Sequence, residues 1–97
     1  MTPQKQPVTL DSRLTVSGEV MVQEVGGEIV LLDMASEQYF GLDAIGTRIW
    51  QLIGQHDLLR DIHGVLCAQF DAAPDQIATD LVALAQSLQE AGLVHAH

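Results

Sequence analysis

The side chains that could bind a metal or attack a substrate gather in one short stretch of this sequence. Within twelve residues lie His56, Asp57, Asp61, His63 and Cys67. A stable zinc site needs three or four ligands at fixed positions, and no CxxC or HExxH spacing occurs here. His63 and Cys67 are four residues apart and could share a helix face. We interpret the stretch as a helix with surface histidines and a small buried thiol, and we expect no metal and no other cofactor.

Catalysis by a nucleophile or an acid–base pair would need both a reactive group and a pocket. Cys67 is the single cysteine, and no Lys or Arg stands close to it in the sequence to favour a reactive thiolate. The acidic residues are spread along the chain, as on a solvated surface. A domain of 97 residues with a filled core leaves little volume for a substrate pocket. We therefore expect that the chain is not an enzyme.

The charge balance limits the class of partner. Thirteen acids against four bases give a formal net charge of -9. Nucleic acids and anionic membranes would be repelled, and no Lys or Arg follows Arg60. The start lacks the pattern of a secretory signal, and no stretch has the eighteen apolar residues of a membrane span. These features, with one cysteine, predict a cytoplasmic protein whose partner is neutral or basic.

Strand patterns fill the first half of the chain. Residues 1–13 have little periodicity and are expected to form a mobile arm, with a short extra strand within residues 8–16 as an option. Two β-rich runs, residues 19–25 and 28–34, are separated by Gly-Gly and predict a hairpin. Residues 38–42 are aromatic-rich and short, which is typical of a third, outer strand. The result is a three-stranded antiparallel meander.

Helical patterns fill the second half. Asp43 is placed to cap a first helix that ends at Gly54, and Asp57 to cap a second. Pro74 suits the first turn of a third helix, which ends at Gly92. The apolar stripes expected to face the core are Ile45, Ile49, Leu52 and Ile53; Leu59, Ile62, Leu66 and Phe70; and Ile77, Leu81, Leu84 and Leu88. The predicted fold is α+β and winged-helix-like, one domain over residues 14–94.

The outer strand is the feature most suited to a function. It carries no Lys or Pro, the usual protection of a sheet edge, so its backbone could accept another strand. The third helix, if it lies alongside, would provide an apolar floor. The predicted peptide-binding residues are Gln38, Tyr39, Phe40, Gly41 and Leu42 on the strand, with Leu81, Leu84, Ala85 and Leu88 on the helix. The alternative is that these apolar side chains are core and that the arm covers the edge.

Several segments at consistent spacing resemble the PqqD-like family: residues 29–33, 38–43, 49–50, 80–84 and 91–94. Members are small winged-helix-like domains that bind the leader of a ribosomally made precursor peptide and deliver it to a modifying enzyme. The resemblance implies that the leader pairs with residues 38–42 and packs against the third helix, where Asp80 joins the site. A DNA-binding regulator is the alternative function. An open edge also predicts a monomer or a weak, strand-swapped homodimer at high concentration.

Two pathways are compatible with this resemblance. PqqD proper, which serves pyrroloquinoline quinone biosynthesis with a radical-SAM enzyme, typically has Pro-Glu between its second and third strands and Asn before its first helix. This chain has Met34-Ala35-Ser36-Glu37 and Asp43 at those places. Together with residues 39–43 and Trp50, it looks more like the stand-alone recognition proteins of lasso-peptide clusters. Their partners would be a peptidase and a cyclase.

Overall fold

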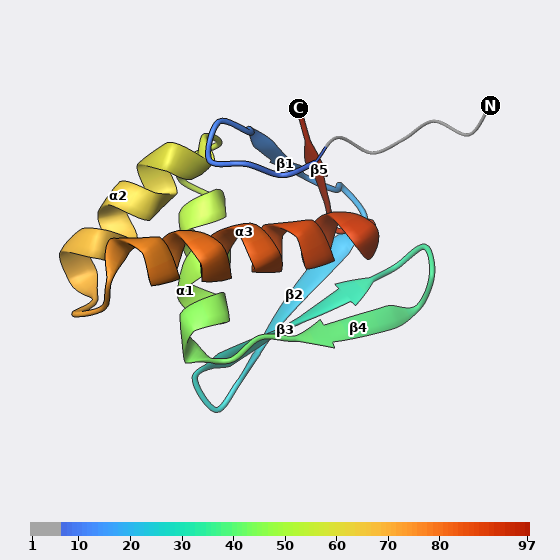
Figure 1. Ribbon diagram of the computed structural model, residues 1–97. Helices are drawn as coiled ribbons and strands as arrows, with labels where there is room; N and C mark the ends of the chain where they lie inside the picture. The colour runs from blue at the N-terminus through green and yellow to red at the C-terminus, as the bar shows by residue number, and fades with distance from the viewer. Residues whose placement is uncertain (1–6) are drawn as a thin grey trace.

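The computed structural model describes residues 7–97 as a small sheet followed by three helices, with a second, two-stranded pairing (Figure 1). Residues 1–6, the first part of the predicted arm, lie outside the described residues. In chain order the elements are β1 (Leu14–Val16), β2 (Val20–Val25), β3 (Glu28–Asp33), β4 (Gln38–Gly41), α1 (Ala44–Ile53), α2 (Leu59–Gln69), α3 (Pro74–Glu90) and β5 (Val94–Ala96). The predicted α+β class is confirmed.

The predicted meander is also present, in the strand order β2-β3-β4. Val25 lies opposite Glu28, so the hairpin turn consists of Gly26 and Gly27, both at positive φ (62° and 84°). Two left-handed residues in succession form a type I′ turn, which matches the twist of antiparallel strands. β3 then pairs with β4 from Asp33 opposite Gln38 to Val30 opposite Gly41. The register of the three strands is therefore defined by these two sets of paired residues.

Local capping explains where two of the helices begin and end. The Asp43 carboxylate accepts a hydrogen bond from the Gly46 N–H at 2.7 Å, which caps α1 as expected. α3 begins with Pro74 and has Ala91 as its C-cap, and the next residue, Gly92, has a φ of +79°. The N–H groups of Gly92 and Leu93 donate to the carbonyls of Gln89 and Leu88 at 3.0 and 2.9 Å. This pair of bonds is a Schellman motif.

The predicted cap of the second helix is wrong. Leu58, and not Asp57, is the N-cap of α2, and within the described chain its side chain makes no capping bond. The Asp57 carboxylate instead accepts a hydrogen bond from Arg13 at 2.9 Å, in an exposed ion pair. Asp57 therefore interacts with Arg13, which precedes β1, and does not cap α2.

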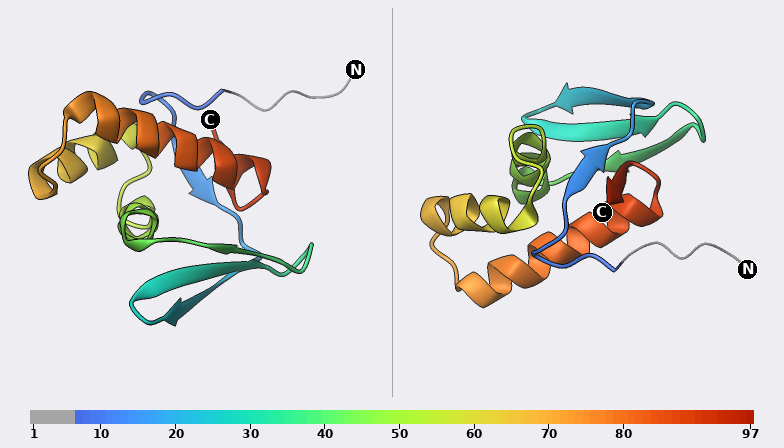
Figure 2. Two further views of the ribbon diagram at one scale, coloured as in Figure 1. Left: turned by 60° about the horizontal axis from the view of Figure 1, so that its bottom comes forward. Right: turned by 90° about the horizontal axis from the view of Figure 1, so that it is seen from above.

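The helices all lie on one side of the three-stranded sheet (Figure 2). The core between them contains Leu14, Ile29, Leu31, Leu42, Ile49, Leu52, Leu59, Ile62, Leu66, Leu81, Leu88, Leu93 and Val94. Most of the predicted helical stripes are therefore buried as expected. Three of their members are not, because Leu84 is half-buried, Ile45 is 50% exposed and Phe70 is 36% exposed. Within residues 7–97, no helix has both the length and the apolar character needed to cross a membrane.

The N-terminal segment packs against the far side of the domain from β4. β1 pairs with β5, a strand that the sequence pattern did not predict, and Leu14 lies opposite Ala96. Val8 is buried, and its N–H donates to the Gln86 side-chain oxygen at 3.1 Å. The described part of the predicted arm, residues 7–13, therefore contacts the domain through Val8. No strand within the described residues pairs with the outer edge of β4.

Candidate functional site

The outer edge of β4 presents backbone groups that the sheet does not use. Leu42 donates its N–H to the Ile29 carbonyl at 2.8 Å, which sets the phase of hydrogen bonding between β4 and β3. Along an antiparallel pair, residues alternate between those that bond to the neighbour and those that do not. Phe40 shares the phase of Leu42, so the N–H and C=O groups of Tyr39 and Gly41 point away from β3. These two residues form the open edge.

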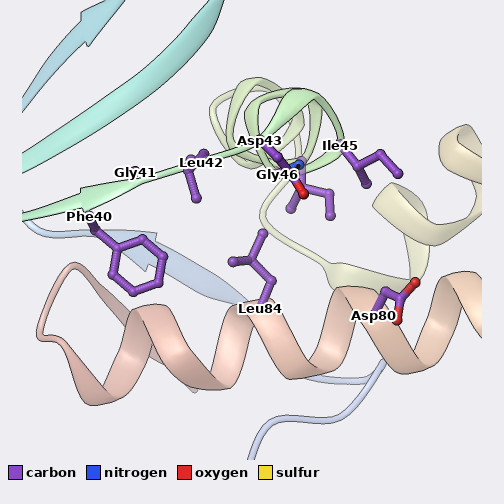
Figure 3. A pocket seen from close by; sticks show the side chains of 9 residues that line it. Phe40, Gly41, Leu42, Asp43, Ile45, Gly46, Asp80 and Leu84 are labelled. Atoms are coloured by element: carbon purple, nitrogen blue, oxygen red, sulfur yellow. Dashed lines mark hydrogen bonds between the residues drawn. The ribbon is translucent and has the colours of Figure 1, made fainter.

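A groove with a volume of about 260 Å³ runs between β4, the start of α1 and the middle of α3. Figure 3 shows Phe40 and Leu84 pointing towards each other across it, one from β4 and the other from α3. Its lining residues are Phe40, Gly41, Leu42, Asp43, Ile45, Gly46, Ile49, Asp80 and Leu84. The open edge and the groove are therefore adjacent, because Phe40 and Gly41 belong to both β4 and the groove wall.

The groove continues in both directions along α3. A second hollow, of about 180 Å³, shares Ile45, Ile49 and Asp80 with the first and reaches Phe70. A smaller one, of about 30 Å³, shares Phe40 and extends to Ala91 and Leu93 near the end of α3. An extended chain laid along β4 would therefore meet hollows beside the start of the strand and beyond its end. Ile45 and Phe70, the two exposed residues of the predicted apolar stripes, both line this surface.

The charged side chains of this surface are acidic. Asp43 and Asp80 line the groove, and Asp71 lines the second hollow. Asp80 accepts a hydrogen bond from the Gln76 side chain at 2.9 Å, which holds its carboxylate beside the groove. No Lys or Arg lines either hollow among the residues that the structure describes. A ligand with neutral or basic side chains at these points is electrostatically favoured.

The predicted site residues divide into two groups. Gln38, Tyr39, Gly41 and Asp80 are exposed, Phe40 and Leu84 are half-buried, and Leu42 is buried in the groove wall. In contrast, the side chains of Leu81, Ala85 and Leu88 have no exposed surface. They belong to the core on the buried side of α3. Contact of these three side chains with a peptide stays a prediction.

Sequence reasoning missed the contribution of the first helix to the groove. Ile45, Gly46 and Ile49 form its third wall, and Asp43 stands at its rim. The sequence does contain a signal for this contribution, because Asp43, the N-cap of α1, follows β4 after only one residue. A helix that starts there must place its first turn at the end of the strand. Ile45 was instead grouped with the core stripe of that helix.

The possible metal ligands within residues 56–67 do not gather around one point. Cys67 Sγ lies 3.4 Å from His63 Nε2, which also contacts the Pro74 carbonyl oxygen at 2.9 Å. Among residues 7–97, no group of three His, Cys, Asp or Glu side chains is placed to hold a metal ion. His63 is satisfied within the fold, where it links α2 to the start of α3.

Comparison with protein families identifies the domain. Residues 28–94, which include β3, β4 and all three helices, match the family described as coenzyme PQQ synthesis protein D. The chain belongs to the PqqD family. The leader-binding domains of this PqqD family are non-catalytic, which confirms that the chain is not an enzyme. A comparison with curated proteins gave no significant match.

Two solved structures share the PqqD fold seen here. One is "TbiB1 in Complex with the TbiA(beta) Leader Peptide", with 30% sequence identity, a TM-score of 0.76, and coverage of 81% of this chain and 92% of that chain. The other is "Lasso peptide synthetase B1 complexed with the leader peptide", with 24% identity, a TM-score of 0.71, and coverage of 84% and 96%. The second likeness, at this identity, concerns the fold alone. Both structures contain a leader peptide.

Proposed function

We propose that this PqqD-family domain binds the leader of a ribosomally made precursor peptide as an added strand on β4 and presents the precursor to a modifying enzyme. The observation that carries the proposal is the open backbone edge of Tyr39 and Gly41 directly beside an apolar groove. Strand addition uses such an edge for affinity and neighbouring pockets for specificity. The leader peptide bound to TbiB1, a relative at 30% identity, supports the same role here.

The energetics of the groove suit a peptide ligand. Each apolar side chain that the leader buries against Leu84, Ile45 or Phe70 contributes about 1.5–3 kcal/mol. Each main-chain hydrogen bond to the edge adds about 0.5–1.5 kcal/mol net. Association and ordering costs of about 4–15 kcal/mol oppose these gains. With two anchors at about 3 kcal/mol each, four edge bonds at about 1.5 kcal/mol each and an association cost of about 4 kcal/mol, the balance is about −8 kcal/mol, which corresponds to the micromolar range.

For the pathway, we favour a lasso-type precursor, with a peptidase and a cyclase as partners, over pyrroloquinoline quinone biosynthesis with a radical-SAM enzyme. The turn that precedes β4 is Met34-Ala35-Ser36-Glu37 and lacks the Pro-Glu typical of PqqD proper. The genes beside the coding sequence separate the two pathways, because a peptidase and an asparagine-synthetase-like cyclase accompany only the lasso type.

The test compares two substitutions on the same helix. Leu84 and Val82 are both half-buried apolar residues of α3, but Leu84 lines the groove, whereas Val82 lines a shallow hollow with Ala78 and Thr79. We expect Leu84→Asp to weaken binding of the cognate leader at least tenfold in fluorescence anisotropy, with a native far-UV circular dichroism spectrum. Val82→Asp should change the affinity less than twofold. Equal effects of the two variants would refute the groove as the binding site.

DNA binding is disfavoured by the charge of the helix that would enter the groove of DNA. α3 carries Asp75, Asp80 and Glu90 and has no Lys or Arg. Affinity for DNA depends on the neutralisation of phosphates by basic side chains. A mobility-shift experiment at low salt is therefore expected to give no complex.

A further inference from the structure

The face of the sheet that points away from the helices is open and apolar. The strand register places Met21 of β2 opposite Leu32 of β3, and Leu32 opposite Tyr39 of β4. Directly opposed residues point to the same side of a sheet. Ile29 and Leu31, which alternate with Val30 and Leu32, face the helices and are buried. The outer face, defined here by Met21, Gln23, Val25, Glu28, Val30, Leu32 and Tyr39, therefore points away from the core.

This outer face is unusual for so acidic a chain. Met21 is 50% exposed, Val25 61% and Tyr39 79%, and no other element within residues 7–97 covers them (Figure 2). Gln23 is the one uncharged polar side chain on the face and Glu28 the one charged side chain, although the whole chain has a net charge of -9. A contiguous apolar surface that charged residues avoid is typical of a docking site for another protein.

The outer face is continuous with the peptide-binding edge through Tyr39. The backbone of Tyr39 belongs to the open edge, whereas its side chain lies in the same row as Leu32 and Met21. A strand added to β4 would widen the sheet by about 4.8 Å and place every second side chain on this face. The bound leader would therefore become part of the surface that a partner meets.

We propose that the outer face docks the enzyme that modifies the precursor, and that the leader strand forms one side of the contact. This inference rests on the proposed leader binding. An enzyme that acts on the precursor is the partner that gains from contacting both the recognition domain and its bound leader. A second copy of the chain is a poorer fit, because two molecules with a net charge of -9 repel each other. The contact surface of the enzyme would be apolar, with a neutral or basic rim.

The strand β2 offers a matched pair of positions for the test. Met21 and Val22 are neighbours with nearly equal exposure, 50% and 48%, but they point to opposite faces of the sheet. Neither lines the groove beside β4. The full chain, with and without saturating leader, is titrated with the purified enzyme that acts on the same precursor. The variants are Met21→Glu and Val25→Glu on the outer face and Val22→Glu on the other, each checked by circular dichroism.

We expect the outer-face variants to weaken enzyme binding at least tenfold and to leave the leader affinity within twofold. Val22→Glu should change neither value more than twofold, and leader should tighten enzyme binding to the unsubstituted chain. Equal enzyme affinities for Met21→Glu, Val25→Glu and Val22→Glu would overturn the proposal. So would a homodimer in sedimentation experiments that Met21→Glu dissociates while enzyme binding is retained. Failure of the unsubstituted chain to bind leader would instead refute the proposed function.

Discussion

Thr47 on α1 accepts a hydrogen bond from the backbone N–H of Ile29 at the start of β3, with a separation of 3.0 Å. The same hydroxyl lies 3.4 Å from the Leu42 carbonyl oxygen, to which it donates. One buried side chain therefore connects the first helix, the central strand and the residue that follows the edge strand. Because Leu42 and α1 both form walls of the groove, this connection sets the spacing between those walls.

Thr47→Val tests that connection. Valine has the same shape but cannot accept the bond from Ile29, and a buried N–H left without a partner costs about 1–3 kcal/mol. We expect the free energy of unfolding, measured by urea denaturation, to fall by that amount. Thr79→Val is the control, because the hydroxyl of Thr79 bonds to the Asp75 carbonyl on an exposed helix surface. A loss of the same size in both variants would show that the Thr47 bonds have no special role.

Tyr39→Pro tests main-chain pairing at the open edge. The Tyr39 N–H points away from β3, so proline removes a donor that the sheet itself does not use, and edge positions tolerate proline. Loss of one edge bond, worth about 0.5–1.5 kcal/mol, should weaken leader binding roughly three- to tenfold by calorimetry. Tyr39→Ala keeps the N–H and should bind leader more tightly than the proline variant. Identical affinities of the two variants would argue against strand addition.

Substitutions of Ile45 and Ile49 on α1 test whether leader binding and the stability of the fold depend on different residues. Both line the groove, but Ile45 is 50% exposed and Ile49 only 2%. Ile45→Ala should reduce leader affinity about tenfold and change the free energy of unfolding by no more than about 0.5 kcal/mol. Ile49→Ala removes core contacts and should destabilise the fold by about 2–5 kcal/mol. Thermal denaturation with parallel leader titrations distinguishes the two outcomes, and a large stability loss for Ile45→Ala would contradict its placement.

Gly92→Ala should destabilise the domain by about 1–2 kcal/mol, because Gly92 has a φ of +79° and an L side chain is strained there. Gly64→Ala provides the opposite control. Gly64 lies inside α2, and an added methyl group would meet nothing within 4 Å. Alanine there should stabilise by about 0.5–1 kcal/mol through its higher helix propensity. Chemical denaturation of both variants would give shifts of opposite sign.

The ion pair at the start of α2 predicts a pH effect. The hydrogen bond from Arg13 lowers the pKa of the Asp57 carboxyl below its ordinary value, and the guanidinium charge acts in the same direction. Because the folded-state pKa is the lower one, the stabilisation is complete above the ordinary value and disappears as the pH falls through the folded-state pKa. We expect Arg13→Ala to raise the Asp57 pKa in a carboxyl NMR titration. Arg60→Ala, which removes a pair with Asp11, should leave it unchanged.

The elements that local chemistry determines were predicted well. The Gly26-Gly27 turn, the Asp43 cap, Pro74 and Gly92 each act over only a few neighbouring residues, and the structure places all four as the sequence indicates. The pairing of β1 with β5 could not be predicted in this way. Two three-residue strands, separated by most of the chain, have no local signal, and only the packed fold brings them together.

The same distinction applies to the groove. Periodicity identified the apolar stripe of α3 but could not say which of its residues remain accessible, so Leu84 was grouped with the buried Leu81, Ala85 and Leu88. The same periodicity assigned Ile45 and Phe70 to the core, because a pattern of apolar residues indicates which face of a helix is apolar and not how exposed each residue is. Which apolar residues stay exposed depends on how the helices cross the sheet, and that is a property of the whole fold.

The brevity of β4 has a consequence for selectivity in a crowded cell. The strand has four residues, and two of them, Tyr39 and Gly41, each present one N–H and one C=O to the open edge. Bonds to these four groups would together yield about 2–6 kcal/mol, which falls short of most of the range of about 4–15 kcal/mol that association costs. Nascent or unfolded chains that offer only a backbone would therefore dissociate at once. A short edge can stay permanently open because it rejects every strand that lacks the matching side chains.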